Sequence, residues 1–96
     1  MITFDTLIHD VNVWADSRSD ESDKSWVEQT EEIGGRLEAL EVAINSDKGP
    51  TIEEMTAMGD VFIALLVLCQ QRGYQADTCL NIAFNKVKNQ PKTEKE

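Results

Sequence analysis

Three observations predict an all-α protein in this chain of 96 residues. Apolar residues recur at spacings of three and four in three separate stretches, which is the period of a helix. Capping-box sequences, Ser25-Trp26-Val27-Glu28 and Thr51-Ile52-Glu53-Glu54, stand before two of the predicted helices. Nine consecutive residues without a polar side chain, 61–69, follow the second capping box, and a fourth helical pattern comes after them. We therefore expect four helices arranged as a bundle around residues 52–72.

The central helix is predicted over Ile52 to Arg72. Its apolar run is too short to cross a bilayer, which needs about 20 residues. The run alone is also compatible with a strand, but the N-cap at Thr51 and the stop signal at Gly73 favour a helix. Because the run is apolar on every side, we expect other elements to surround it. Asp60 stands at its edge, either near the end of the buried zone or held by a partner such as a cation.

Helix one is predicted from Thr3 to Ser17, and a polar loop over 18–24 is predicted to follow it. His9 lies outside the apolar stripe of this helix and is expected to be solvated. The stripe comprises Phe4, Leu7, Ile8, Val11, Trp14 and Ala15. Helix two is predicted from Trp26 to Asn45. Its core-facing stripe comprises Trp26, Thr30, Ile33, Leu37, Leu40 and Ile44. The pair Gly34-Gly35 in its middle indicates a close backbone approach, a bend, or side chains lost by drift.

Helix four is predicted from Ala76 to Asn89, with a flexible tail over 91–96, so that residues 1–90 form one domain. Its stripe comprises Ala76, Cys79, Leu80, Ala83 and Val87. Polar and basic residues gather in its last turns: Asn85, Lys86, Lys88 and Asn89. They either complement the helix dipole or form the basic edge of an anion site.

The net charge of −9 is uneven, because residues 1–60 carry 15 acidic and 4 basic side chains while residues 61–96 carry 3 and 5. A chain this acidic is not expected to bind nucleic acid through a basic surface. It could bind phosphates through a divalent cation, or a basic protein partner. The two cysteines lack CxxC spacing, which indicates free thiols in a reduced protein. The N-terminus lacks a leader pattern, so we expect a cytoplasmic protein that does not enter a membrane.

Carboxylates of helix two and of the central helix are expected to approach each other across the turn between the helices. They are Glu28, Glu31, Glu32, Glu38, Glu53 and Asp60. Oxygen clusters of this kind suit Mg²⁺ or Mn²⁺. A merely solvated acidic face is the simpler interpretation of the pattern alone, and both remain open.

Five segments together resemble a MazG-like nucleoside triphosphate pyrophosphohydrolase, over most of the chain. They are Val11-Asn12-Val13-Trp14-Ala15, Glu31-Glu32-Ile33-Gly34, Leu37-Glu38-Ala39-Leu40, Gly59-Asp60-Val61 and Ala83-Phe84-Asn85-Lys86-Val87-Lys88-Asn89. The resemblance implies an all-α fold in which helices two and three form the core of a homodimer or homotetramer. It also implies hydrolysis of a nucleoside triphosphate to the monophosphate and pyrophosphate. Small members of this kind are common in bacteria and phages.

In the family, an E-x-x-E pair and an E-x-x-D pair hold Mg²⁺. Glu32 and Asp60 match one member of each pair, but the other two positions are Gly35 and Ala57. The resemblance makes Glu32 and Asp60 the catalytic and metal-binding residues, with Glu28, Glu31, Glu38 and Glu53 as possible replacements for the missing ligands. It also implies that Lys86, Asn85 and Asn89 contact phosphate or base, and that Trp14 stacks on the base. Core packing is the simpler role for Trp14.

Three functions follow as hypotheses. The first is a Mg²⁺-dependent nucleotide pyrophosphohydrolase with weak activity. The second is a protein of the same scaffold that binds or sequesters a nucleotide without turnover, since two ligand positions are missing. The third is an acidic module that docks a basic protein.

Overall fold

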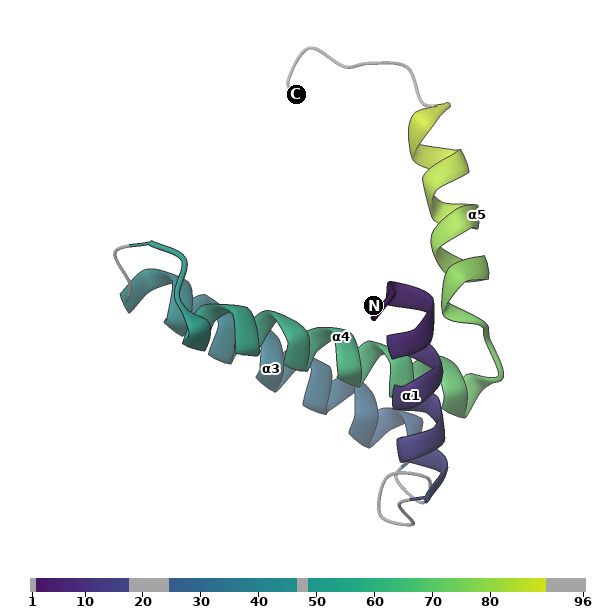
Figure 1. The fold of residues 1–96 in the computed structure, drawn as a ribbon, viewed down its shortest axis with the longest axis horizontal. Coiled ribbons are helices and arrows are strands. Elements are labelled where there is room, and N and C mark those ends of the chain that lie inside the picture. The colour runs from purple at the N-terminus through teal and green to yellow at the C-terminus, as the bar shows by residue number, and fades with distance from the viewer. Residues whose placement is uncertain (1, 18–24, 47–48, 90–96) are drawn as a thin grey trace.

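The structure is a computed structural model that describes residues 2–17, 25–46 and 49–89. All regular structure in these ranges is helical: α1 (Phe4–Ser17), α3 (Trp26–Ser46), α4 (Ile52–Arg72) and α5 (Ala76–Lys88) (Figure 1). The predicted all-α class with four helices is thus confirmed, and each predicted boundary agrees to within one residue. The predicted loop over 18–24 and tail over 91–96 lie outside the described ranges, and so does part of the turn before α4.

The helix ends form where the capping residues predicted them. The backbone N–H of Ser25 donates to Glu28 Oε1 (3.0 Å) and that of Glu28 donates to Ser25 Oγ (3.1 Å), a reciprocal capping box. Thr51 Oγ1 accepts from the N–H of Glu54 (3.1 Å). Gly73 ends α4 at φ 77°, a left-handed conformation that glycine adopts without a side-chain penalty.

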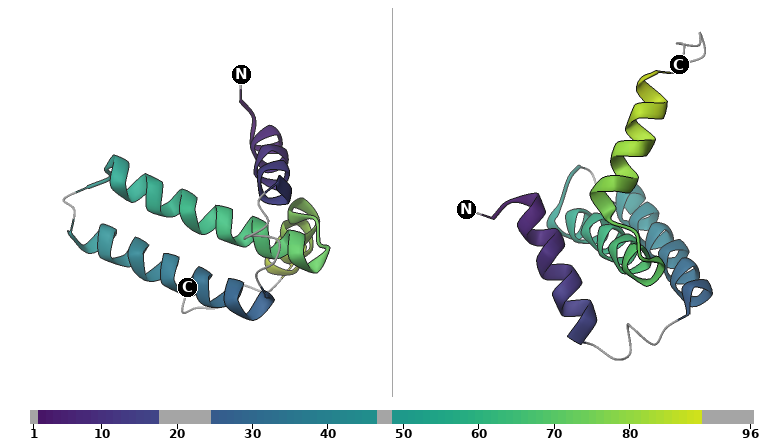
Figure 2. Two further views of the ribbon diagram at one scale, coloured as in Figure 1. Left: turned by 90° about the horizontal axis from the view of Figure 1, so that it is seen from below. Right: turned by 90° about the vertical axis from the view of Figure 1, so that its right-hand side faces the viewer.

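The two long helices, α3 and α4, make the most extensive contact in the described chain and run antiparallel, side by side (Figure 2). Val61, Ala64 and Val67 of α4 are buried, and Leu40 is buried on α3. This contact is the core of the described chain.

The face of α3 that meets α4 differs from the predicted one. Leu40 is buried and Ile33 is half-buried as expected, but Trp26, Thr30, Leu37 and Ile44 are exposed. Gln29, Glu32 and Arg36 lie on the covered side in their place. The contact face is therefore rotated around α3 toward polar residues, and this rotation brings charged side chains beside α4.

Helix α1 packs less extensively, against α4 alone among the close contacts. Gln70 Nε2 donates to the backbone oxygen of Asn12 (3.1 Å) and to Asp16 Oδ1 (2.6 Å). The rings of Phe4 and Phe62 meet edge to face at 6.4 Å. These contacts fix α1 across part of α4.

Helix α5 leaves the end of α4 and projects away from the other helices, with which it makes only marginal contact (Figures 1 and 2). It has no buried residue. Of the predicted stripe, Ala76 and Cys79 are half-buried, and Cys79 lies beside Cys69 of α4. Leu80, Ala83 and Val87 are exposed, so this part of the stripe is not core in a single chain.

The expectation that the apolar run of α4 is surrounded on every side is also wrong for a single chain. Phe62, Ile63 and Leu65 within the run are exposed, and so are Met55 and Met58 before it. None of the described helices is long and apolar enough to cross a membrane.

Candidate functional site

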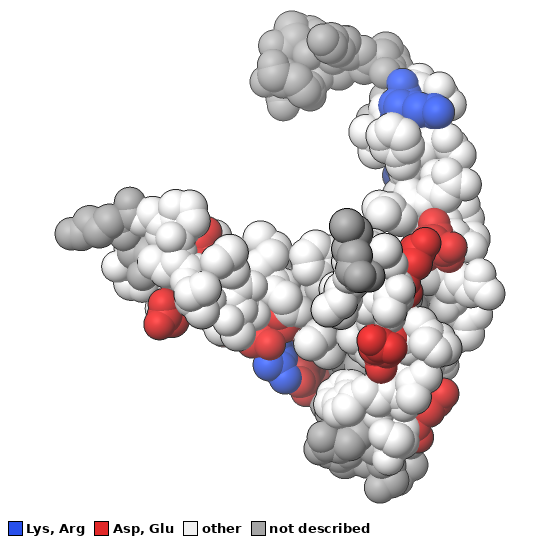
Figure 3. All heavy atoms as spheres, viewed as in Figure 1, with Lys and Arg blue, Asp and Glu red and all other residues white. Residues whose placement is uncertain are grey.

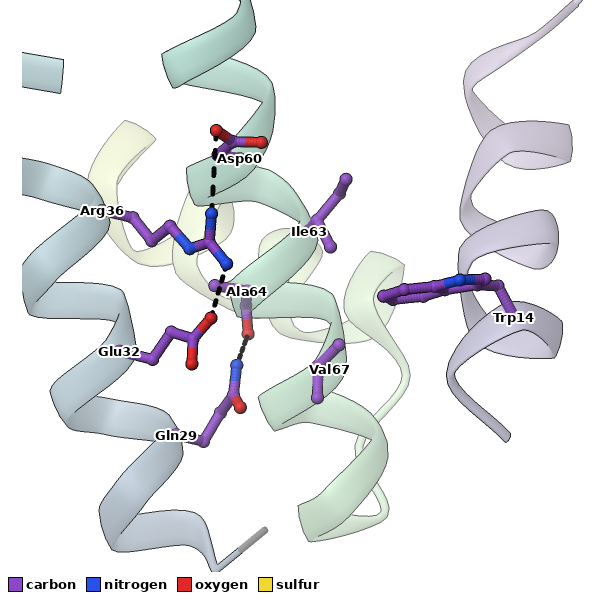
Figure 4. A pocket seen from close by; sticks show the side chains of 8 residues that line it. All are labelled: Trp14, Gln29, Glu32, Arg36, Asp60, Ile63, Ala64 and Val67. Atoms are coloured by element: carbon purple, nitrogen blue, oxygen red, sulfur yellow. Dashed lines mark hydrogen bonds and ion pairs between the residues drawn. The ribbon is translucent and has the colours of Figure 1, made fainter. Parts of the chain in front are cut away.

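A cleft of about 170 Å³ lies between α3 and α4 and opens toward α1 (Figure 4). Its walls combine apolar and ionisable side chains, which come from three helices. They are Trp14 of α1, Gln29, Glu32 and Arg36 of α3, and Asp60, Ile63, Ala64 and Val67 of α4.

Glu32 and Asp60, predicted from the resemblance to face one another, do line this same cleft. The guanidinium of Arg36 lies between them. Its Nη2 donates to Glu32 Oε2 at 2.6 Å, and its Nη1 lies 3.7 Å from Asp60 Oδ2 (Figure 4). Glu32 and Arg36 are four residues apart, so successive turns of α3 bring them to one side of the helix.

Arg36 lowers the mutual repulsion of the two carboxylates. With Glu32 and Asp60 ionised, the three side chains carry a net charge of −1. The side chains are 29% (Glu32), 43% (Arg36) and 41% (Asp60) exposed, so water screens the interaction and each ion pair contributes little to stability. The arrangement matters more for what the cleft can bind.

The donor set does not fit a Mg²⁺ ion as it stands. Among the described residues, no group of three or more acidic, histidine or cysteine side chains could hold a metal. A magnesium ion needs near-octahedral oxygen ligands at about 2.0–2.1 Å. Here a guanidinium contacts the two carboxylates that the ion would use, and Gly35 and Ala57 supply no side-chain oxygen.

Gln29 gives the cleft a buried polar group. Its side chain is 1% exposed, and its Nε2 donates to the backbone oxygen of Ala64 at 2.9 Å. Its Oε1 is buried and has no hydrogen-bond partner within the described residues. A buried acceptor in this state costs free energy until a donor reaches it, so a water or a ligand N–H or O–H would be stabilised there.

The other predicted site residues lie elsewhere. Glu28 forms the capping box of α3, while Glu31, Glu38 and Glu53 are exposed and do not line the cleft. Asn85, Lys86 and Asn89 lie in or just after the last turn of α5, which projects away from this cleft. Trp14 does line it, although the side chain remains 39% exposed.

Sequence reasoning missed Arg36 and Gln29. The i, i+4 spacing of Glu32 and Arg36 is a readable signal for an ion pair. Gln29 carried no such signal, because it stands outside the apolar stripe and only the rotation of α3 buries it.

The pKa of Cys69 is raised above the ordinary value of a thiol. Burial is the main cause that raises it, and the neighbouring Cys79, through its charge and a side-chain hydrogen bond, raises it further. Both cysteines are free and half-buried, in agreement with the predicted free thiols.

Comparison with protein-family models, curated proteins and solved structures gave no match for this chain. The assignment of function therefore depends on the sequence resemblance and on the geometry of the cleft.

Proposed function

We propose that this chain is a MazG-like nucleotide pyrophosphohydrolase-type protein that binds a nucleotide in the cleft between α3 and α4 and hydrolyses it weakly. The observation that carries the proposal is the convergence of Glu32 and Asp60, from neighbouring helices, on one cleft. They are the two acidic positions that match the family motif. If the family resemblance were accidental, nothing would require the side chains of Glu32 and Asp60 to line the same cleft.

At about 170 Å³ the cleft would enclose part of a nucleotide, and its lining offers contacts for that part. Trp14 offers an aromatic face against which a base could stack, and Ile63 and Val67 provide apolar wall. The orphaned Gln29 Oε1 would accept a hydrogen bond from an N–H or O–H of the ligand. Glu32 or Asp60 would position the attacking water by accepting its proton.

Weak turnover follows from the same residues. The resemblance implies Mg²⁺ or Mn²⁺, yet only two of four carboxylates are present and Arg36 contacts both of them. An ion could use Glu32 and Asp60 only after the guanidinium had moved away. Arg36 is 43% exposed, so water is available to receive it.

Release of pyrophosphate from a panel of standard and modified nucleoside triphosphates, with Mg²⁺ or Mn²⁺, tests the proposal. We expect turnover above that of an Asp60→Ala control. The Gly35→Glu, Ala57→Glu double variant should be more active, and a Cβ built at Gly35 meets no atom within 4 Å, so a side chain fits there. Turnover by the wild type that does not exceed the Asp60→Ala control would overturn the catalytic part.

Nucleotide binding without turnover is the second candidate, favoured by the contact of Arg36 with both carboxylates. Calorimetric titration of the protein with a nucleotide, with a chelator present to remove divalent metal ions, separates the two functions. Saturable binding that is lost in Asp60→Ala, combined with no pyrophosphate release, would establish the binder. No saturable binding, with or without a divalent ion, would overturn both candidates.

A further inference from the structure

Two thiols lie together at the junction between α4 and α5. Cys69 stands in the last turn of α4 and Cys79 in the first turn of α5. The connection between the two helices spans only residues 73–75, so these two turns are close along the chain. Both cysteines are free, and a side-chain hydrogen bond joins the two thiols. The cleft between α3 and α4 is lined by neither of them.

The backbone of the junction ties both cysteines to the connection. Gly73 turns the chain at φ 77°, and the N–H of Tyr74 donates to the backbone oxygen of Cys69 at 2.8 Å. On the other side of the connection, the N–H of Cys79 donates to the backbone oxygen of Gln75 at 3.0 Å. The two thiols therefore face each other across a short segment that is hydrogen-bonded at both ends.

Burial along α5 identifies the side of this helix that faces α4. Ala76 and Cys79 are its only half-buried residues, and the rest of the helix is exposed. Beyond its first turns, α5 stands clear of the arm formed by α3 and α4 (Figure 3). Little packing therefore opposes the small adjustment of α5 that would bring the two Cα atoms to the roughly 5.5–6 Å of a disulfide.

We propose that Cys69 and Cys79 form a reversible disulfide that tethers α5 to the end of α4, with a small-molecule disulfide such as oxidised glutathione as the oxidant. The tether would restrict the directions in which α5 leaves α4, which the connection over 73–75 alone does not fix. The proposal is independent of what the cleft binds.

The exchange takes two steps. Cys79 lines an open groove with Tyr74 and Ile82, so a small disulfide can reach its sulfur. The Cys79 thiolate attacks one sulfur of the oxidant, forms a mixed disulfide and releases one thiolate. The Cys69 thiolate then attacks the Cys79 sulfur and releases the second thiolate. The released thiolates take up the two protons that the cysteines lose, so the cysteine pair loses two electrons and the oxidant gains them.

The order of the two attacks follows from the surroundings of the thiols. Burial raises the pKa of Cys69, which keeps this thiol protonated at neutral pH and leaves the first attack to Cys79.

Equilibration of the full chain in glutathione buffers tests the proposal. Acid quenching, alkylation and peptide mass spectrometry at low protein concentration give the fraction of chains with the intramolecular disulfide, and hence the equilibrium constant of the exchange. We expect this constant to be roughly tenfold or more larger in the native chain than in the same chain unfolded in urea. The fold holds the two thiols together, whereas the unfolded chain must first close a loop.

A matched variant moves the second thiol to the other side of α5. Asn81 is exposed and lies about 200° around the helix from Cys79. In the Cys79→Ser, Asn81→Cys double variant the loop to Cys69 is only slightly longer, so the unfolded variant should form its disulfide about as readily as the unfolded wild type. The native variant should lose the advantage that the native wild type has over its unfolded form.

Hydrogen exchange measures the tether itself. In the oxidised wild type, amides of α5 after its first turn should exchange several-fold more slowly than in the reduced wild type, because local opening of α5 is restricted. Cys79→Ser in the same buffers should show no such change.

A native wild type whose equilibrium constant is no larger than that of the unfolded chain would overturn the proposal. So would oxidation that yields only glutathione adducts or disulfide-linked pairs of chains, or a native double variant that oxidises as readily as the native wild type. A disulfide that forms but leaves the exchange of α5 unchanged would overturn the tether.

Discussion

The two long sides of α4 are both apolar in sequence but differ in what covers them. On one side Val61, Ala64 and Val67 pack against α3 and are buried. On the other side Met55, Met58 and Phe62 are exposed. The covered side carries small side chains that permit close helix packing, and the exposed side carries large, flexible or aromatic ones, which are typical of an interface between molecules. The difference teaches that a helix can be apolar all round and still have only half of its surface buried by its own chain.

The largest expected effect compares a valine on the covered side of α4 with an exposed valine of α3. Val67 is 3% exposed beside α3, whereas Val42 of α3 is 65% exposed. Val67→Asp should lower the free energy of unfolding by about 4 kcal/mol, because it places an unpaired charge in the core. Val42→Asp should change it by less than about 0.5 kcal/mol. Chemical denaturation of the two variants measures both values, and equal losses would mean that α3 and α4 do not pack as described.

The second comparison concerns two glycines. Gly73 stands at φ 77° where the chain turns from α4 into α5, and Gly34 lies inside α3 with no atom within 4 Å of an added Cβ. Gly73→Ala should destabilise the protein by about 1 kcal/mol, because alanine is strained in the left-handed region. Gly34→Ala should stabilise it by about 0.5–1 kcal/mol through helix propensity.

Thermal unfolding of these two alanine variants gives the sign of each effect. A destabilised Gly34→Ala would show that another backbone approaches α3 closely at this point, which is one of the three interpretations that the Gly34-Gly35 pair allows.

A smaller effect is expected on the covered side of α4, at the cleft. Arg36→Met removes the cation between Glu32 and Asp60 and should cost less than about 1 kcal/mol at neutral pH, since the groups are partly exposed. Millimolar Mg²⁺ should stabilise Arg36→Met more than the wild type, because the two carboxylates are then available to the ion. Equal Mg²⁺ effects on both proteins would contradict the account of Arg36.

The smallest effect concerns the end of α4 near α5. The raised pKa of Cys69 keeps this thiol protonated at neutral pH, and only the thiolate is nucleophilic. Alkylation of Cys69 by iodoacetamide, followed by peptide mass spectrometry, should therefore be slower than that of an exposed model thiol. The alkylation rate should continue to rise above pH 9.0, which is the ordinary pKa of such a thiol. A rate that levels off below this pH would show that Cys69 is not shielded by its neighbours.

The elements of the fold were predictable from local signals, because caps and periodicity act over a few residues. Ser25, Thr51 and Gly73 each begin or end a helix as their sequence context predicts. The partner of each helix face was not predictable. Leu37 and Ile44 satisfy the helical period as well as Leu40 does, yet only Leu40 is buried, since the rotation of α3 about its own axis selects the face that meets α4.

The candidate site shows the same limit. The pair Glu32 and Asp60 was predicted from the resemblance, and the two side chains do share a cleft. The roles of Arg36 and Gln29 depend on the rotation of α3 about its axis, which is a tertiary property. The position of Lys86 far from the cleft likewise follows from the direction of α5, which the three-residue connection after α4 does not fix.

Hydrogen exchange of the full chain tests most directly the claim that the contact between α3 and α4 is the core of the described chain and that α5 lies largely outside it. Amides of α3 and of the middle of α4 should be the best protected, because these two helices make the most extensive contact. Amides of α5 should exchange faster, because no residue of α5 is buried. Protection of α5 equal to that of the middle of α4 would contradict the account.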